Sequence, residues 1–122
     1  MIAKILKTFL EEPHHYAIFF YDKQVNFIGS YSICDNYLYN VHVLEERQGK
    51  GYGSELVRHA MHEKNELYLD VDPENTKAKR CYERCGFKFE KKLFNYHHSC
   101  WGKGVLPATE IERYVWHSGV DL

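Results

Sequence analysis

The first segment of the chain places apolar residues at the i, i+3, i+4 spacing of a helix. The residues are Ile2, Ile5, Leu6, Phe9 and Leu10. This spacing predicts a short amphipathic helix over residues 2–11.

The next three segments are rich in aromatic and β-branched residues and are separated by polar turns. They predict strands over 15–21, 25–34 and 37–43. On the third strand a two-residue repeat predicts that four side chains share one face: Tyr37, Tyr39, Val41 and Val43.

The pattern changes after residue 44. A polar stretch with three glycines, 45–53, precedes a predicted helix over 54–64, and residues 67–71 alternate as a strand. A second helix buries a stripe at i, i+3, i+4 and i+7, made of Ala78, Cys81, Tyr82 and Cys85. Gly86 follows as a left-handed helix cap. Strands over 87–93 and 110–117 close the chain, with a loop over 97–109 between them.

These elements predict one α/β domain over residues 1–122, in the order helix, three antiparallel strands, helix, strand, helix, two strands. The formal net charge is −1 and the basic residues are scattered. We therefore expect neither a nucleic-acid partner nor a membrane partner. The start of the chain has no signal-peptide pattern, so we expect a cytoplasmic location.

The chain holds four cysteines. In a reducing compartment they are expected to be free thiols. Cys81 and Cys85 with His97, His98 and Cys100 match zinc spacing poorly, because no Cys-x-x-Cys pair occurs. The sequence therefore predicts no metal site.

The loop Gln48–Gly53 lies between a predicted strand and a predicted helix. Glycines let the backbone approach a ligand closely, and a helix N-terminus presents unpaired N–H groups. An anion site follows from this arrangement. The glycine spacing fits neither the dinucleotide fingerprint nor the P-loop, and the alternative is a turn that needs several glycines for its shape.

Two blocks of the sequence carry a family resemblance. Gln48, Gly51 and Gly53 match the pattern of Gln or Arg, two residues, Gly, one residue, then Gly or Ala. The strand 67–71, Asn75 and the run Tyr82-Glu83-Arg84-Cys85-Gly86-Phe87 follow in the same order and spacing as the family's second motif. Together the blocks resemble the GNAT family of N-acetyltransferases over residues 37–89.

The resemblance implies a mixed α+β fold, with a mostly antiparallel central sheet flanked by helices. The family's first strand and paired helices, which wall the acceptor site, are expected here only as one short helix, a shortened N-terminus. The strands 37–43 and 67–71 are expected to splay apart and to hold acetyl-CoA between them. The implied cofactor residues are Val41, His42, Val43, Gln48, Gly49, Lys50, Gly51, Tyr52, Gly53, Ser54, Asn75 and Tyr82.

The resemblance also implies catalytic roles. Tyr82 matches the tyrosine that serves the leaving sulfur, although its place on a helical stripe also fits a core residue. Asn75 fits a helix cap as well as a cofactor contact. Asp70 is interpreted either as the base, through a relaying water, or as an anion that binds the amine. Histone-type members carry a glutamate where this chain has Tyr37, and His42 also fits a surface histidine.

The function that follows is transfer of an acetyl group from acetyl-CoA to a primary amine of a small molecule, peptide or protein. The acids Asp70, Asp72 and Glu74 and the loop over 97–109 favour a cationic amine. A catalytically weak acyl-CoA sensor is the first alternative and a Cys/His metal module is the second, and the sequence leaves a homodimer open.

Overall fold

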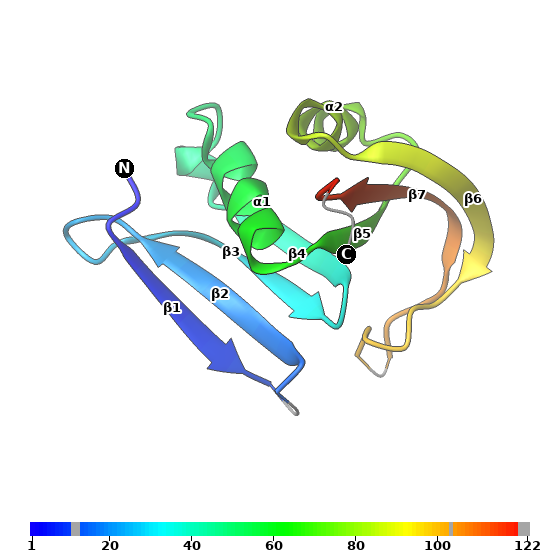
Figure 1. The fold of residues 1–122 in the computed structure, drawn as a ribbon, viewed down its shortest axis with the longest axis horizontal. Helices are drawn as coiled ribbons and strands as arrows, with labels where there is room; N and C mark the ends of the chain where they lie inside the picture. The colour runs from blue at the N-terminus through cyan, green and yellow to red at the C-terminus, as the bar shows by residue number, and fades with distance from the viewer. Residues whose placement is uncertain (11–12, 103, 120–122) are drawn as a thin grey trace.

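The computed structural model describes residues 1–10, 13–102 and 104–119. One seven-stranded sheet runs through the molecule in the order β1-β2-β3-β4-β5-β7-β6, with both helices on the same side of it (Figure 1). The elements in chain order are β1 (Lys4–Phe9), β2 (His15–Tyr21), β3 (Phe27–Cys34), β4 (Tyr37–Val43), the 3-10 turn η1 (Glu45–Arg47), α1 (Tyr52–Glu63), β5 (Glu66–Val71), α2 (Thr76–Cys85), β6 (Lys88–Tyr96) and β7 (Ala108–His117).

The helix predicted over 2–11 is wrong: residues 4–9 form the edge strand β1, and residue 11 lies outside the described part. β1 pairs antiparallel with β2 from Lys4↔Tyr21 to Phe9↔Tyr16. All six residues of β1 are exposed, so their apolar spacing did not report a buried helical face. The N-terminal segment therefore supplies a strand, and only residues 10–14 join it to β2.

The main core lies between α1 and the sheet. Leu56, Val57 and Ala60 of α1 are fully buried and belong to the same cluster as Ile28 and Leu38. Burying a side chain of this size stabilises a fold by roughly 1.5–3 kcal/mol. This packing holds α1, and therefore the loop before it, in a fixed position over β3 and β4.

β4 and β5 run parallel but share one register pair, Tyr37↔Tyr68, in the described structure. Next to this pair β4 contains an extra residue, because Ser32 lies opposite Tyr39 whereas Ser30 lies opposite His42. Asn40 has a φ of 51° at this bulge. A bulge bends its strand, so the rest of β4 turns away from β5 and a gap opens between them.

The same bulge changes which side chains of β4 share a face. Tyr37 and Tyr39 stack on each other at 5.3 Å, whereas Val41 and Val43 pack against the core cluster beneath α1. The prediction that all four share one face is therefore wrong. A two-residue repeat loses its phase wherever one residue is added to a strand.

The second half of the sheet follows the predicted pattern more closely. β7 lies between β5 and β6 and pairs antiparallel with both. Leu69 and Val71 of β5 are buried in the core cluster, and Asp70 lies on the opposite face. Gly86 ends α2 with a φ of 109°, which confirms the left-handed cap. In the part of the chain that is described, neither helix has the length and apolar character to span a membrane.

Candidate active site

The glycine loop enters α1 through a left-handed turn. Gly49 and Gly51 have φ values of 78° and 86°, a region that side chains disfavour. A Cβ added at either position would meet no atom within 4 Å. Backbone conformation therefore requires these glycines, and the space on their Cβ side is open rather than packed with protein.

An ion pair beneath the loop keeps it in place. Arg47 contacts Asp22 at 2.6 Å, and the same carboxylate accepts hydrogen bonds from the backbone N–H of Gln24 and Asn26. The hydrogen bond from Arg47, followed by that from Asn26, lowers the pKa of Asp22. The carboxylate therefore stays charged and ties the loop to the β2–β3 connection.

A cavity of about 400 Å³ lies beside the loop, between β4 and α2. Among the residues predicted to bind the cofactor, its lining includes Val41, Val43, Gln48, Gly49, Gly51, Tyr52, Gly53, Ser54, Asn75 and Tyr82. His42 and Lys50 were predicted but do not line it, and the His42 side chain is exposed. The motif and the cavity therefore agree in position, with those two residues outside.

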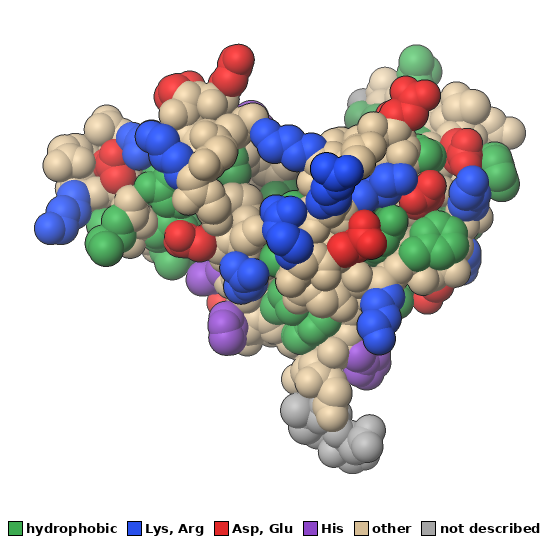
Figure 2. Space-filling view, turned by 90° about the horizontal axis from the view of Figure 1, so that it is seen from above, with side chains coloured by type: hydrophobic (Ala, Val, Ile, Leu, Met, Phe, Trp, Pro, Cys, Tyr) green, Lys and Arg blue, Asp and Glu red, His purple; other side chains and the backbone are tan. Residues whose placement is uncertain are grey.

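The sequence reasoning missed four residues that line this cavity: Lys77, Ala78, Cys81 and Arg84. Lys77 and Arg84 add positive charge opposite the glycine loop. Seen from above, Lys and Arg side chains gather across the middle of the molecule, and a hollow separates its two lobes (Figure 2). The available signal was the group of basic residues on α2 that follows Asn75, which suits an anionic ligand.

Asn75 caps α2. Its side-chain oxygen accepts a hydrogen bond of 3.2 Å from the backbone N–H of Ala78. The capping interpretation is therefore confirmed. Asn75 also lines the cavity, so the cap places its amide group where a ligand can reach it.

Tyr82 projects from α2 to the place where the strands diverge. It packs against the core cluster with Ala78 and Cys85. Burial, with smaller contributions from Cys81 and Cys85, raises the pKa of Tyr82 to about 12. The phenol therefore keeps its proton at neutral pH and can donate it to a developing anion.

A second cavity, also of about 400 Å³, lies on the other side of Tyr82. Val41 and Tyr82 line both cavities, so the two spaces meet at these residues. The remaining lining comes from β4, β5 and the segment after β6: Tyr37, Leu38, Tyr39, Asn40, Leu69, Asp70, Trp101, Gly102, Val105, Leu106 and Ala108.

Asp70 is the one acidic residue in the lining of this second cavity. Both of its oxygens accept hydrogen bonds from Arg113, at 2.8 and 3.1 Å, and its side chain is 2% exposed. Arg113 also donates to the Tyr96 hydroxyl. The carboxylate is therefore held in a bidentate pair, with little of its surface open to the cavity.

The other acids of the predicted cluster lie elsewhere. The Asp72 carboxylate accepts a hydrogen bond of 2.9 Å from the backbone N–H of Glu74, and neither residue lines the second cavity. Of the three acids, the structure brings Asp70 alone to this space.

The segment after β6 covers the second cavity. Trp101 donates a hydrogen bond of 2.9 Å to the hydroxyl of Tyr37, which ties the segment to β4. His98 is buried and stacks on the Tyr37 ring at 3.7 Å. Burial lowers the pKa of His98, so the imidazole is neutral near pH 7. Lys103, also expected here, lies outside the described residues.

The expectation that all four cysteines are free is wrong for two of them. Cys34 and Cys100 form a disulfide, with Cα atoms 6.6 Å apart, whereas Cys81 and Cys85 are free. The bonded pair is separated by 66 residues, so spacing could not reveal it. The fold brings them together because the segment after β6 passes the β3–β4 turn.

Comparison with known proteins places this site in a family. The model of the "Acetyltransferase (GNAT) family" matches residues 2–87. The spermidine N(1)-acetyltransferase of Vibrio cholerae is 33% identical over 84 residues, covering 59% of this chain and 49% of the relative. The chain thus spans about half the length of that curated relative.

Two solved structures show the same fold. A Vibrio cholerae spermidine N-acetyltransferase in complex with CoA and spermine has a TM-score of 0.71 at 22% identity, covering 88% of this chain and 68% of that one. A Bacillus subtilis acetyltransferase in complex with CoA has a TM-score of 0.67 at 16% identity, covering 85% and 77%. With the matching cofactor motif, splayed strands and Tyr82, these findings show that the chain belongs to the GNAT acetyltransferase family.

Proposed function

We propose that the chain is an N-acetyltransferase that moves an acetyl group from acetyl-CoA to a primary amine. The observation that carries this proposal is the meeting of two cavities at Tyr82. One has the N–H groups of a helix N-terminus and two basic side chains. The other has aromatic walls. A thioester in the first and an amine in the second would meet at a phenol that keeps its proton.

The reaction divides the work between the two cavities. The glycine loop would bind the cofactor pyrophosphate, and Val41 and Val43 would lie along the pantetheine arm. The neutral amine attacks the thioester carbonyl, the C–S bond breaks, and Tyr82 gives its proton to the departing thiolate. Proximity in two adjoining spaces supplies part of the rate acceleration.

We propose that Asp70 serves as a fixed anion rather than as a mobile base. Arg113 occupies both carboxylate oxygens, so a proton abstracted from the amine would compete with that pair. The carboxylate instead holds Arg113 and keeps that cation from being an unpaired positive charge at the cavity wall. Water would then carry the amine proton away.

We propose a cationic amine of the polyamine type as the acceptor. The wall of the second cavity contains Tyr37, Tyr39 and Trp101, whose ring faces attract ammonium groups. The spermidine acetyltransferases that resemble this chain support the same class. A cytoplasmic location would give the enzyme both substrates.

The second candidate is an acyl-CoA sensor. The Asp70–Arg113 pair favours it, because Arg113 occupies both oxygens of the one acidic residue that lines the second cavity. The test is thiol release from acetyl-CoA with spermidine, a lysine peptide and a neutral amine, together with a melting scan with acetyl-CoA. Release with spermidine that exceeds release with the neutral amine supports the enzyme. A melting shift with acetyl-CoA, but no thiol release with any of the three amines, would support the sensor instead.

A further inference from the structure

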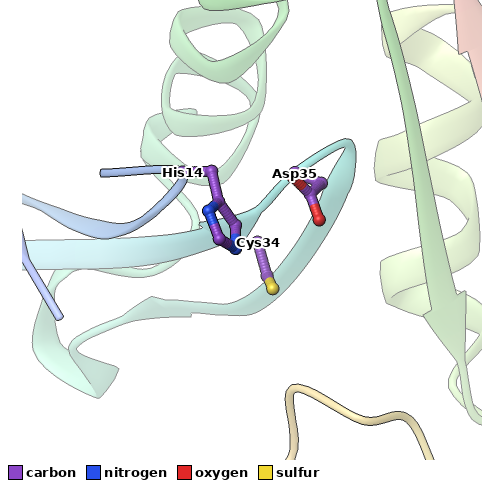
Figure 3. A group of neighbouring side chains, drawn as sticks. All are labelled: His14, Cys34 and Asp35. Carbon is purple, nitrogen blue, oxygen red and sulfur yellow. The ribbon is translucent and has the colours of Figure 1, made fainter. Parts of the chain in front are cut away.

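A group of side chains of the types that bind metal ions lies at the β3–β4 turn, beside the segment after β6. One ligand atom each from His14, Cys34 and Asp35 lies within 4.8 Å of the other two. The three side chains converge where β3 ends, and the segment after β6 passes beneath them (Figure 3). Cys100 of that segment is bonded to Cys34, so a fourth side chain that could bind a metal is already at the cluster.

Backbone contacts hold the cluster in shape. The backbone N–H of Asp35 donates a hydrogen bond of 3.0 Å to the carbonyl of His14, next to the register pair His15↔Cys34. Asp35 has a φ of 55° in the tight turn between β3 and β4. Cys34 is the last residue of β3, His14 directly precedes β2 and Asp35 lies in the β3–β4 turn, whereas Cys100 comes from the segment after β6.

The cluster also has access to solvent. His14 and Asp35 are exposed, and Cys34 is 9% exposed. A hollow of about 660 Å³ is lined by His14, Cys34, Asp35 and Cys100 together. An ion could enter this hollow without any rearrangement of the sheet.

We propose that the reduced chain binds one zinc ion through Cys34, Cys100, His14 and Asp35. A thiol reductant supplies two electrons and two protons and opens the disulfide to two thiols. Zinc then displaces both thiol protons, and two Zn–S bonds form beside one bond to an imidazole nitrogen and one to a carboxylate oxygen. Disulfide and metal therefore exclude each other.

The donor set and the distances suit zinc. Two thiolates, one imidazole and one carboxylate are ligands that zinc takes in tetrahedral sites. Bonds of about 2.0–2.3 Å hold tetrahedral ligand atoms roughly 3.3–3.8 Å apart. The ligand atoms of His14, Cys34 and Asp35 already lie within 4.8 Å of one another, and the Cys100 sulfur is brought to them by its bond to Cys34.

Neighbouring groups define the site further. The Nδ1 atom of His98 accepts a hydrogen bond from the backbone N–H of Cys100, and its Nε2 contacts the Tyr68 hydroxyl. His98 therefore supports the Cys100 backbone and is not a ligand. A reducing compartment would keep Cys34 and Cys100 as two thiols. The dithiol is the state that binds the metal.

The zinc site would also regulate the second cavity, which we call the acceptor cavity because the amine is proposed to bind there. This consequence rests on the proposed function. Cys100 directly precedes Trp101, which covers that cavity. Either a disulfide or a metal ion would fix this segment against β3, whereas two free thiols would release it. Metal binding itself does not depend on acetyl transfer, so the two proposals can fail separately.

The test uses the full chain with Cys81 and Cys85 changed to serine, so that only the proposed cysteines remain. The reduced protein is titrated with Co²⁺ and then Zn²⁺, with the absorption spectrum and calorimetry as readouts. We expect one ion per chain, a thiolate-to-cobalt charge-transfer band and tetrahedral visible bands, all lost on addition of zinc. The oxidised protein should bind at least about a hundred-fold more weakly, since both thiolates are absent.

Ligand variants separate this site from adventitious binding. Cys100→Ser should abolish the charge-transfer intensity of one thiolate, and His14→Ala or Asp35→Asn should weaken zinc at least about ten-fold, the least that loss of a supporting residue costs. His97→Ala, on the same segment, is the matched control and should bind as before. Equal affinity in the oxidised and reduced protein, or no stoichiometric ion in the reduced protein, would overturn the proposal.

Discussion

The two cavities that meet at Tyr82 are built in different ways. The first cavity, the proposed cofactor cavity, is lined largely by two short continuous segments, the glycine loop and α2. The acceptor cavity draws on β4, β5 and the segment after β6, and its chemistry is in side chains. A short motif can therefore specify the first, whereas the second exists only once distant segments are packed together.

The comparison also separates stable from adjustable parts. The glycine loop is held by the ion pair between Arg47 and Asp22 and by the packing of α1. The segment after β6, which we call the acceptor segment, is held by the Trp101–Tyr37 hydrogen bond and by the Cys34–Cys100 disulfide. We therefore expect changes in redox state to act on the acceptor and to leave cofactor binding alone.

The largest expected effect comes from Tyr82, which belongs to both cavities. Tyr82→Phe should lower turnover by about 10²–10⁴-fold, because the general acid is lost. The melting shift produced by acetyl-CoA should persist, because the ring and its packing remain. The pKa of about 12 also predicts no loss of wild-type turnover from Tyr82 ionisation up to about pH 10. Wild-type turnover in the variant would return Tyr82 to a purely structural role.

Gly51→Val should abolish acetyl-CoA binding in the proposed cofactor cavity and leave the acceptor cavity unchanged. A β-branched residue is strained at a φ of 86°, and its side chain would occupy the space of the pyrophosphate. In the wild type, acetyl-CoA at a hundred times its Kd should stabilise the fold by about 2.7 kcal/mol, and the variant should lose this shift in a melting scan. Gly102→Val, in the acceptor segment, is the matched control. Loss of the shift in both variants would show that the two cavities are not separable.

Asp70→Asn should act on the acceptor cavity and on stability. Breaking a buried ion pair costs about 3–5 kcal/mol, and Asp70 is 2% exposed. The uncompensated Arg113 should then repel ammonium groups, so kcat/KM for spermidine should fall more than for a neutral amine. Asp72→Asn is the control, since Asp72 does not line the cavity. An equal fall for both amines would mean that Asp70 matters only for folding.

The smallest effect concerns Trp101→Phe. This change removes one hydrogen bond to Tyr37, worth about 0.5–1.5 kcal/mol, and keeps most of the ring. We expect KM for the amine to rise by roughly two- to ten-fold, with KM for acetyl-CoA unchanged, in steady-state kinetics with each substrate varied. A change in the acetyl-CoA value instead would contradict the separation of the cavities.

Local signals predicted much of the fold. β2, β5, α1, α2 and the Gly86 cap appeared at their positions within a few residues, because alternation, amphipathic spacing and cap chemistry are properties of neighbouring residues. The same spacing failed at residues 2–11, where the pattern fitted a helix but the chain pairs with β2. Pairing with the next strand is not encoded in the apolar spacing of one strand by itself.

The sequence by itself determined the glycine loop, the Asn75 cap and the position of Tyr82 on α2, since each depends on residues within about one helical turn. The tertiary structure alone decided the bulge at Asn40, which splays the sheet, and the ion pair of Asp70 with Arg113 across β5 and β7. It also decided the link between Cys34 and Cys100, 66 residues apart. The bulge depends on the register of β3 against β4, whereas the ion pair and the disulfide join segments that are distant along the chain, and closing such loops depends on the packing of the whole sheet.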